Sequence, residues 1–199
     1  MVSRMIITED TTFVPVDDQP VVGIDTAKTL ATTVLDVRVG PGYVMIANQF
    51  ILGGNSMAEI LPNVPEGTSL FKYNLAARSY SRNMFVAGAW ADPTQTFGLG
   101  EGAFFYNSTA GYVDLALTGQ IQLNNPPRQF GSGTYLISVP YPRSGPLSQV
   151  LDFQPRDGDT IYKFDNAAGG YAIYGYVGGV WFNQDPFIEV AESFWFHRP

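Results

Sequence analysis

Apolar and polar residues alternate over short runs along most of the chain, with the period of two that is typical of β-strands. Residues 34–39, for example, alternate Val, Leu and Val with Asp and Arg, and residues 112–123 form a similar run. Turns that contain Gly and Pro separate these runs. The i, i+3, i+4 spacing of a helical turn occurs at Met57, Ile60 and Leu61. The pattern predicts an all-β, antiparallel fold that is sandwich- or barrel-like.

The most informative feature is an internal repeat with an offset of 91 positions. Identical residues at this offset include Gly42 and Gly133, Lys72 and Lys163, Tyr80 and Tyr171, Trp90 and Trp181, and Glu101 and Glu192. An offset of 90 aligns residues 57–61 with 147–151 around the predicted helical turn. The repeat predicts two tandem homologous β-domains over residues 21–118 and 119–199, preceded by an N-terminal β-arm over residues 1–20.

Each copy is expected to contain the same order of elements. A strand leads to the helical turn, a hairpin of two strands follows, and a tryptophan and a closing strand complete the copy. The predicted strands are residues 43–48, 69–73, 80–86 and 102–106 in the first copy, and 134–139, 160–164, 171–177 and 193–196 in the second.

Composition narrows the range of functions. The formal net charge is −7 and the chain has only 11 Lys and Arg residues, which argues against binding to nucleic acid or to an anionic membrane. The sequence contains no cysteine, so disulfides, thiolate nucleophiles and cysteine metal ligands are excluded. No apolar run approaches the ~18 residues of a membrane span, and no export signal is visible, so we expect no membrane insertion.

The pairs Lys72 with Glu101 and Lys163 with Glu192 recur in both copies and invite two interpretations. A glycosidase needs two carboxylates across one sugar ring, and a charged neighbour can separate their pKa values. Equivalent glutamates of two separate copies are not expected to share a ring. We therefore predict structural ion pairs, no catalytic residues and no cofactor.

Other motifs carry weaker signals. His197 is the only histidine, so a catalytic triad or a histidine metal site is not expected. The acidic loop of residues 157–159 lacks a recognised cation-binding spacing, and we predict no metal. Asn107 begins an Asn-Ser-Thr sequon and is a candidate glycan acceptor.

Aromatic residues are plentiful, with 14 Phe, 11 Tyr and 3 Trp. Because Tyr80 and Trp90 recur as Tyr171 and Trp181, we predict that these four form the equivalent cores of the two copies. Aromatic residues found in one copy, such as Tyr174 and Phe182, would suit a sugar-stacking surface instead.

The arm contains apolar and β-branched residues and lies outside both copies. We predict that it pairs as a strand with a neighbouring subunit. The residues expected to make this contact are Ile6, Ile7, Phe13, Val14 and Val16.

Several motifs resemble duplicated secreted domains of planctomycete and verrucomicrobial bacteria. They are Gly-Tyr-x-x-Ile-Ala-Asn-Gln at 42–49, Ile-Leu-Pro-Asn-Val-Pro-Glu-Gly-Thr at 60–68, Gly-Glu-Gly-Ala-Phe-Phe-x-Asn at 100–107, Asp-Gly-Asp-Thr-Ile-Tyr-Lys-Phe at 157–164 and Glu-Ser-Phe-Trp-Phe at 192–196. The resemblance covers the chain after about Val21. It implies an extracellular or cell-surface setting and no particular chemistry.

Together these features predict a non-catalytic, extracellular structural protein that assembles with itself into a fibre or surface layer by head-to-tail strand pairing. A carbohydrate-binding or adhesion module is the main alternative, with glycans as partners, and a viral surface structural protein is a further one.

Overall fold

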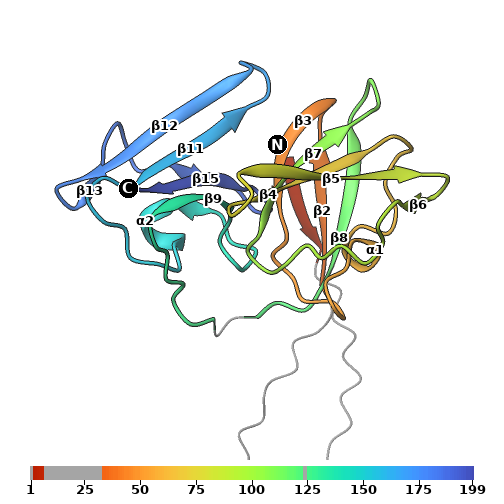
Figure 1. Cartoon of the computed structure of the whole chain (residues 1–199), viewed down its shortest axis with the longest axis horizontal. Helices are drawn as coiled ribbons and strands as arrows, with labels where there is room; N and C mark the ends of the chain where they lie inside the picture. The colour runs from red at the N-terminus through yellow and green to blue at the C-terminus, as the bar shows by residue number, and fades with distance from the viewer. Residues whose placement is uncertain (1, 7–32, 123–124) are drawn as a thin grey trace, which may run out of the picture.

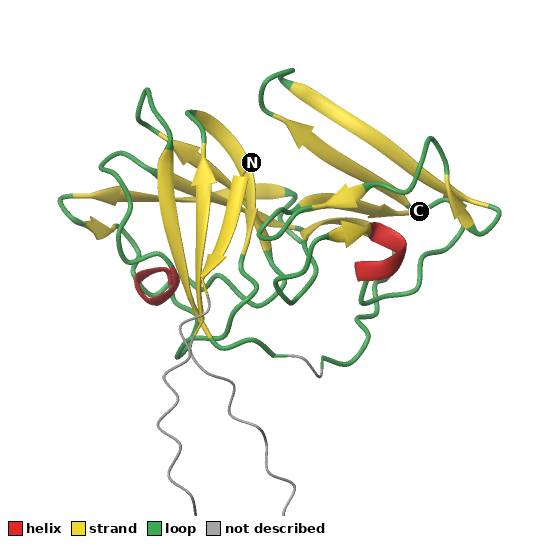
Figure 2. Cartoon of the chain, turned by 180° about the vertical axis from the view of Figure 1, so that it is seen from behind, coloured by secondary structure: helices red, strands yellow, loops and turns green. Residues whose placement is uncertain are grey.

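The computed structural model describes residues 2–6, 33–122 and 125–199 of the chain. It is an all-β structure of antiparallel sheets with two short helical turns (Figures 1 and 2). The arm residues Ile7, Phe13, Val14 and Val16 lie outside the described residues.

The first copy forms a five-stranded sheet in the order β3-β7-β4-β5-β6. Its strands are β3 (Gly42–Ala47), β4 (Ser69–Asn74), β5 (Ser79–Val86), β6 (Ala89–Trp90) and β7 (Gly102–Asn107). Strands β4 and β5 form the predicted hairpin, and positive φ at Arg78 helps the chain to reverse between them.

The second copy forms a sheet in the equivalent order, β9-β15-β11-β12-β13. Its strands are β9 (Gly133–Ile137), β11 (Thr160–Asp165), β12 (Gly170–Val177), β13 (Val180–Trp181) and β15 (Phe194–Arg198). The register repeats as well, because Ser69 pairs with Met84 as Thr160 pairs with Gly175. The repeat in the sequence is thus a repeat in the strand order and in the pairing of backbone groups.

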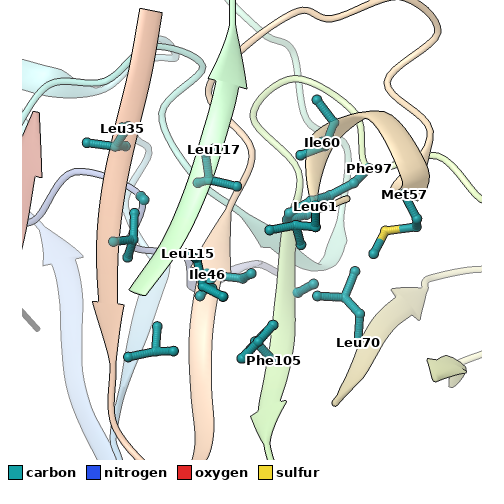
Figure 3. Close-up of a cluster of buried hydrophobic side chains, with 14 of the residues drawn as sticks. Leu35, Ile46, Met57, Ile60, Leu61, Leu70, Phe97, Phe105, Leu115 and Leu117 are labelled. Atoms are coloured by element: carbon teal, nitrogen blue, oxygen red, sulfur yellow. The ribbon is translucent and has the colours of Figure 1, made fainter. Parts of the chain in front are cut away.

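A third sheet covers the first copy. It consists of β1 (Val2–Ile6), β2 (Thr33–Val39) and β8 (Val113–Gly119) in the order β1-β2-β8. Alternate residues of β2 and β8 are buried against the five-stranded sheet, so the first copy is a two-layer β-sandwich (Figure 3). The core residues that Figure 3 labels are Leu35, Ile46, Met57, Ile60, Leu61, Leu70, Phe97, Phe105, Leu115 and Leu117.

Each copy has the short helix that the spacing predicted, α1 (Met57–Ile60) and α2 (Leu147–Val150). Both helices bury the first and last residue of the turn in the core of their own copy. In the second copy, β10 (Gly145–Pro146) and β14 (Phe187–Ile188) form a two-stranded sheet beside α2.

The two copies meet through reciprocal backbone contacts. The Ala47 N–H donates to Ala191 C=O at 2.9 Å, and the Ser138 N–H, from the position equivalent to Ala47, donates to Gly100 C=O at 3.0 Å. Two isolated bridges, Ile46 with Glu192 and Ile137 with Glu101, exchange in the same way. The contacts therefore follow a pseudo-two-fold relation, which brings β3 and β9 to the centre and leaves β5 and β12 toward the outer ends of the two sheets.

Candidate functional site

The two Lys–Glu pairs form equivalent braces near the junction of the copies. Lys72 Nζ lies 2.9 Å from Glu101 Oε1, and Lys163 Nζ lies 3.1 Å from Glu192 Oε2. Each lysine also donates to a backbone carbonyl, that of Thr96 in the first copy and of Phe187 in the second. All four charged side chains are at least two-thirds buried.

Backbone groups hold the glutamates in place from the other side. Glu101 Oε2 accepts the Gly98 N–H at 2.8 Å, and Glu192 Oε2 accepts the Glu189 N–H at 2.9 Å. Each carboxylate is thus bound by its own lysine and its own loop. The arrangement fixes the loop before the closing strand, where the two copies pair.

The described residues contain no group of three or more His, Asp or Glu side chains that could hold a metal ion. Asp159, from the acidic loop, is fully buried, and its carboxylate is engaged by Arg198, with Nε to Oδ1 at 2.9 Å and Nη2 to Oδ2 at 2.6 Å. Hydrogen bonding to Asp159 raises the pKa of Arg198. The acidic loop therefore contributes the carboxylate of a buried ion pair. Within the part of the chain that is described, no helix is long and apolar enough to cross a membrane.

The four predicted core aromatics divide into two groups. Trp90 and Trp181 are buried, and each ring meets an aromatic residue of the neighbouring strand, Phe85 at 5.5 Å and Tyr176 at 5.0 Å between centroids. Tyr80 and Tyr171, by contrast, are 46% and 45% exposed, so the prediction that they are core residues is wrong.

Tyr80 and Tyr171 lie on the opposite face of their hairpins from the tryptophans, close to the junction of the copies. The ring of Tyr80 packs edge-on against Phe104 of its own copy and Trp195 of the other. Partial burial, with smaller contributions from Tyr171 and Tyr73, raises the pKa of Tyr80 to about 12. These tyrosines form the rim of an aromatic seam between the copies and are not part of either core.

Asn107 is not available as a glycan acceptor in the folded protein. It is buried, and its Nδ2 donates to the carbonyls of Gly40 at 3.1 Å and Gly111 at 2.8 Å. Its Oδ1 accepts from Thr109. The sequon residues form a turn that closes the end of β7.

The N-terminal strand has a partner within its own chain. Residues Val2–Ile6, which include the predicted contact residue Ile6, pair antiparallel with residues 34–38 of β2. For this part of the arm, the structure replaces the predicted intermolecular pairing with pairing to the same molecule. The sequence did not predict that β2 would offer a free edge to the arm. The sheet that presents this edge forms only when β2 pairs with β8, and these two segments are about 80 residues apart in the chain.

A hollow of about 500 Å³ lies beside Trp181 in the second copy. Aromatic residues Phe153, Tyr176 and Trp181 line it together with the polar side chains of Gln154 and Asp185. In the first copy, Trp90 Nε1 donates to Leu61 C=O at 2.7 Å, whereas the buried Trp181 Nε1 has no hydrogen-bond partner among the described residues. The surroundings of the two tryptophans therefore differ at the end of the helical turn.

The outer edge of β12 is open like that of β5, but only the β12 edge is free of charged residues. Strand β13 pairs only with Tyr176 and Val177, so residues 170–175 have no strand on that side within the described structure. Ile173 is 54% exposed, and the nearby Val180 and Phe182 are exposed to a similar or greater degree. An apolar strip thus runs along an open strand edge.

Sequence reasoning missed two polar residues that join the copies. The Arg128 guanidinium binds Asp152, and it also donates to the carbonyls of Gly100 and Ser138, one in each copy. Gln49 is fully buried, accepts the Ala191 N–H at 2.8 Å and donates to Val139 C=O at 3.2 Å. Neither Gln49 nor Arg128 has an identical residue at the offset of 91 positions. This difference between the copies is the one sequence signal that could have pointed to a role at their junction.

Comparisons of the chain with protein-family models, with curated proteins and with solved structures give no significant match.

Proposed function

We propose that this protein is a non-catalytic structural protein of the cell exterior that assembles with copies of itself. The recurring charged residues support a structural role, because Lys72, Glu101, Lys163 and Glu192 are engaged in internal braces. The resemblance to duplicated secreted domains supports an extracellular or cell-surface setting.

The observation that carries self-assembly is the open, apolar edge of β12. Exposed strand edges are usually protected by charged residues, proline or a covering loop, because their free N–H and C=O groups pair readily with another chain. Residues 170–177 contain neither a charged residue nor a proline. This edge therefore has the chemistry of an assembly surface.

A filament requires a second, different contact, because a symmetric contact by itself closes into a dimer. Our proposal for this contact is the remainder of the N-terminal arm, beyond the strand that pairs with β2. Head-to-tail pairing of that segment would extend dimers into a fibre or a surface layer.

The test is the size of the full-length protein in solution. We expect sedimentation velocity and negative-stain microscopy to show dimers or longer assemblies whose proportion rises with concentration. A protein that remains monomeric at high concentration would overturn the proposal. Hydrolysis of aryl glycosides that is lost in Glu101→Gln would contradict the non-catalytic assignment.

A carbohydrate-binding or adhesive role is the second candidate, and the hollow beside Trp181 favours it. Sugar sites combine an aromatic face with a few polar groups that fix the hydroxyls, and Tyr176, Gln154 and Asp185 offer this combination. A glycan array should then show binding that Asp185→Ala weakens, because Asp185 lines this hollow and not the neighbouring cavity. Gln129→Ala, which lines only the neighbouring cavity, is the control.

A further inference from the structure

The edge strands at the outer ends of the two sheets differ although they are copies of each other. In the first copy, Gln95 Nε2 reaches Ser81 Oγ at 3.3 Å, and the Asn83 side chain exchanges hydrogen bonds with the backbone of Asp92. The edge of β5 is therefore partly covered by its own loop. Strand β12 lies at the upper margin of the second copy in both views, and only the two-residue strand β13 pairs on its outer side (Figures 1 and 2).

The hydrogen bonds of β12 show which of its backbone groups are free. Tyr176 exchanges backbone hydrogen bonds with the β11 side, through Gly158 N–H and Asp159 C=O, whereas Gly175 C=O points outward and accepts Phe182 N–H at 2.6 Å. Orientation alternates along an antiparallel strand. The N–H and C=O groups of Tyr171 and Ile173 therefore point to the open side.

Charge distinguishes this edge from the equivalent edge of the first copy. The chain carries a net charge of −7, which opposes the approach of two copies at most orientations. Residues 166–184 contain no Asp, Glu, Lys, Arg or His. The equivalent segment of the first copy, residues 75–93, contains Arg78, Arg82 and Asp92. Unlike the edge of β5, the β12 edge is thus a place where a second identical chain can approach without opposing charges.

We propose that two copies of this chain pair edge to edge through antiparallel β12 strands, which joins their second-copy sheets into one continuous sheet. This inference rests on the proposed self-assembly and names its surface. Residues that point outward must face each other in hydrogen-bonded pairs. Because Gly175 C=O already accepts Phe182 N–H, the register that uses both free residues pairs Tyr171 with Ile173 of the partner subunit, and the reverse pair follows by symmetry.

This register places Ala172 on the two-fold axis, opposite Ala172 of the partner subunit. Such a non-hydrogen-bonded pair has its Cα atoms ~4.5 Å apart, which is within the range that a disulfide spans. The small side chain of alanine suits this close approach. The flanking aromatic and β-branched pairs are of the kind that stabilise adjacent strands.

Disulfide trapping tests the register directly, because the native chain contains no cysteine. Ala172→Cys should form a covalent dimer under mild oxidation, seen as a band of doubled mass on a non-reducing gel. Ser81→Cys, at the equivalent exposed position of the first copy, is the matched control and should remain mostly monomeric. Equal crosslinking of the two variants, or none in either, would overturn the proposed pairing.

A charge variant tests the same surface without a covalent bond. Ile173→Arg introduces the residue type found at the equivalent Arg82, and two such charges would lie near each other across the dimer. We expect the dissociation constant to rise more than about tenfold, since opposing like charges cost several kcal/mol. Val86→Arg, at an exposed apolar position of the first copy, should leave the dissociation constant unchanged.

The outcomes separate this inference from the proposed function. If the native chain assembles but Ile173→Arg assembles equally well, the β12 contact is wrong and self-assembly stands. If the native chain is monomeric at all concentrations, both fail. Ile173 is exposed, so its replacement should not prevent folding, and circular dichroism before each measurement verifies this.

Discussion

The two copies share strand order and register, but at one pair of equivalent buried positions they carry different side chains. In the second copy, Asp159 and Arg198 form a buried ion pair, and Arg198 also donates to the carbonyls of Phe130 and Gln154. The equivalent residues in the first copy are Thr68 and Asn107, and Asn107 instead binds the turn that follows β7. The same backbone frame therefore accommodates a charged pair or two neutral residues at this position, and in the first copy the buried Thr68 Oγ1 has no hydrogen-bond partner among the described residues.

The copies also differ in what covers them. The three-stranded sheet β1-β2-β8 closes the core of the first copy, whereas the described part of the second copy is covered by α2, β10, β14 and loops. The apolar edge and the hollow beside Trp181 both belong to the second copy. The first copy is thus the better covered half, and the second carries both the exposed apolar edge and the hollow.

The largest expected effect comes from removing one partner of the buried Asp159–Arg198 ion pair. Arg198→Leu leaves the Asp159 carboxylate buried without its partner, so the free energy of unfolding should fall by about 3–5 kcal/mol. Urea denaturation followed by tryptophan fluorescence measures this loss.

The matched control converts the pair to its counterpart in the first copy. Asp159→Thr combined with Arg198→Asn removes both charges, and its cost should be clearly smaller than that of Arg198→Leu. A double variant as unstable as the single one would show that the two copies are not interchangeable at this position.

A smaller effect should distinguish the two tryptophans. Trp90→Phe removes the hydrogen bond to Leu61 and leaves a buried carbonyl unsatisfied, which typically costs about 1–3 kcal/mol. Trp181→Phe removes no hydrogen bond to a described residue and should be less destabilising. Equal losses in urea denaturation would mean that the indole environments are alike.

The smallest effect concerns the aromatic seam at high pH. Because the pKa of Tyr80 is raised to about 12, the folded state favours the neutral phenol. The stability that this provides is complete below pH ~10, the ordinary pKa of tyrosine, and is lost as pH rises toward 12. Tyr80→Phe should therefore lose less stability between pH 10 and 12 than the native protein, as measured by thermal unfolding. Tyr112→Phe, which removes an exposed phenol, is the control and should not reproduce this change.

Much of the architecture could be predicted from local patterns in the sequence. Alternation and turn residues specify the hairpins, and the 91-residue offset specifies that β4, β5 and β6 recur as β11, β12 and β13 with the same register. These features depend on neighbouring residues, and the recurrence of Lys72 and Glu101 with Lys163 and Glu192 already pointed to contacts repeated in each copy.

Other features depended on which distant segments meet. An aromatic residue in a strand can pack on either face of the sheet. The recurrence of Tyr80 as Tyr171 therefore could not show whether these rings lie in the core of each copy or at the seam between the copies. Gln49 and Arg128 bind backbone groups of segments far away in the chain, and their surroundings exist only after the copies have docked. The sequence by itself determined the strands and their repetition, because these arise from local geometry and from burial of one face. Only the tertiary structure decided that β2 pairs with β8 over the first copy and that β12 is left with an open edge, because such pairings depend on long-range docking that no local pattern encodes.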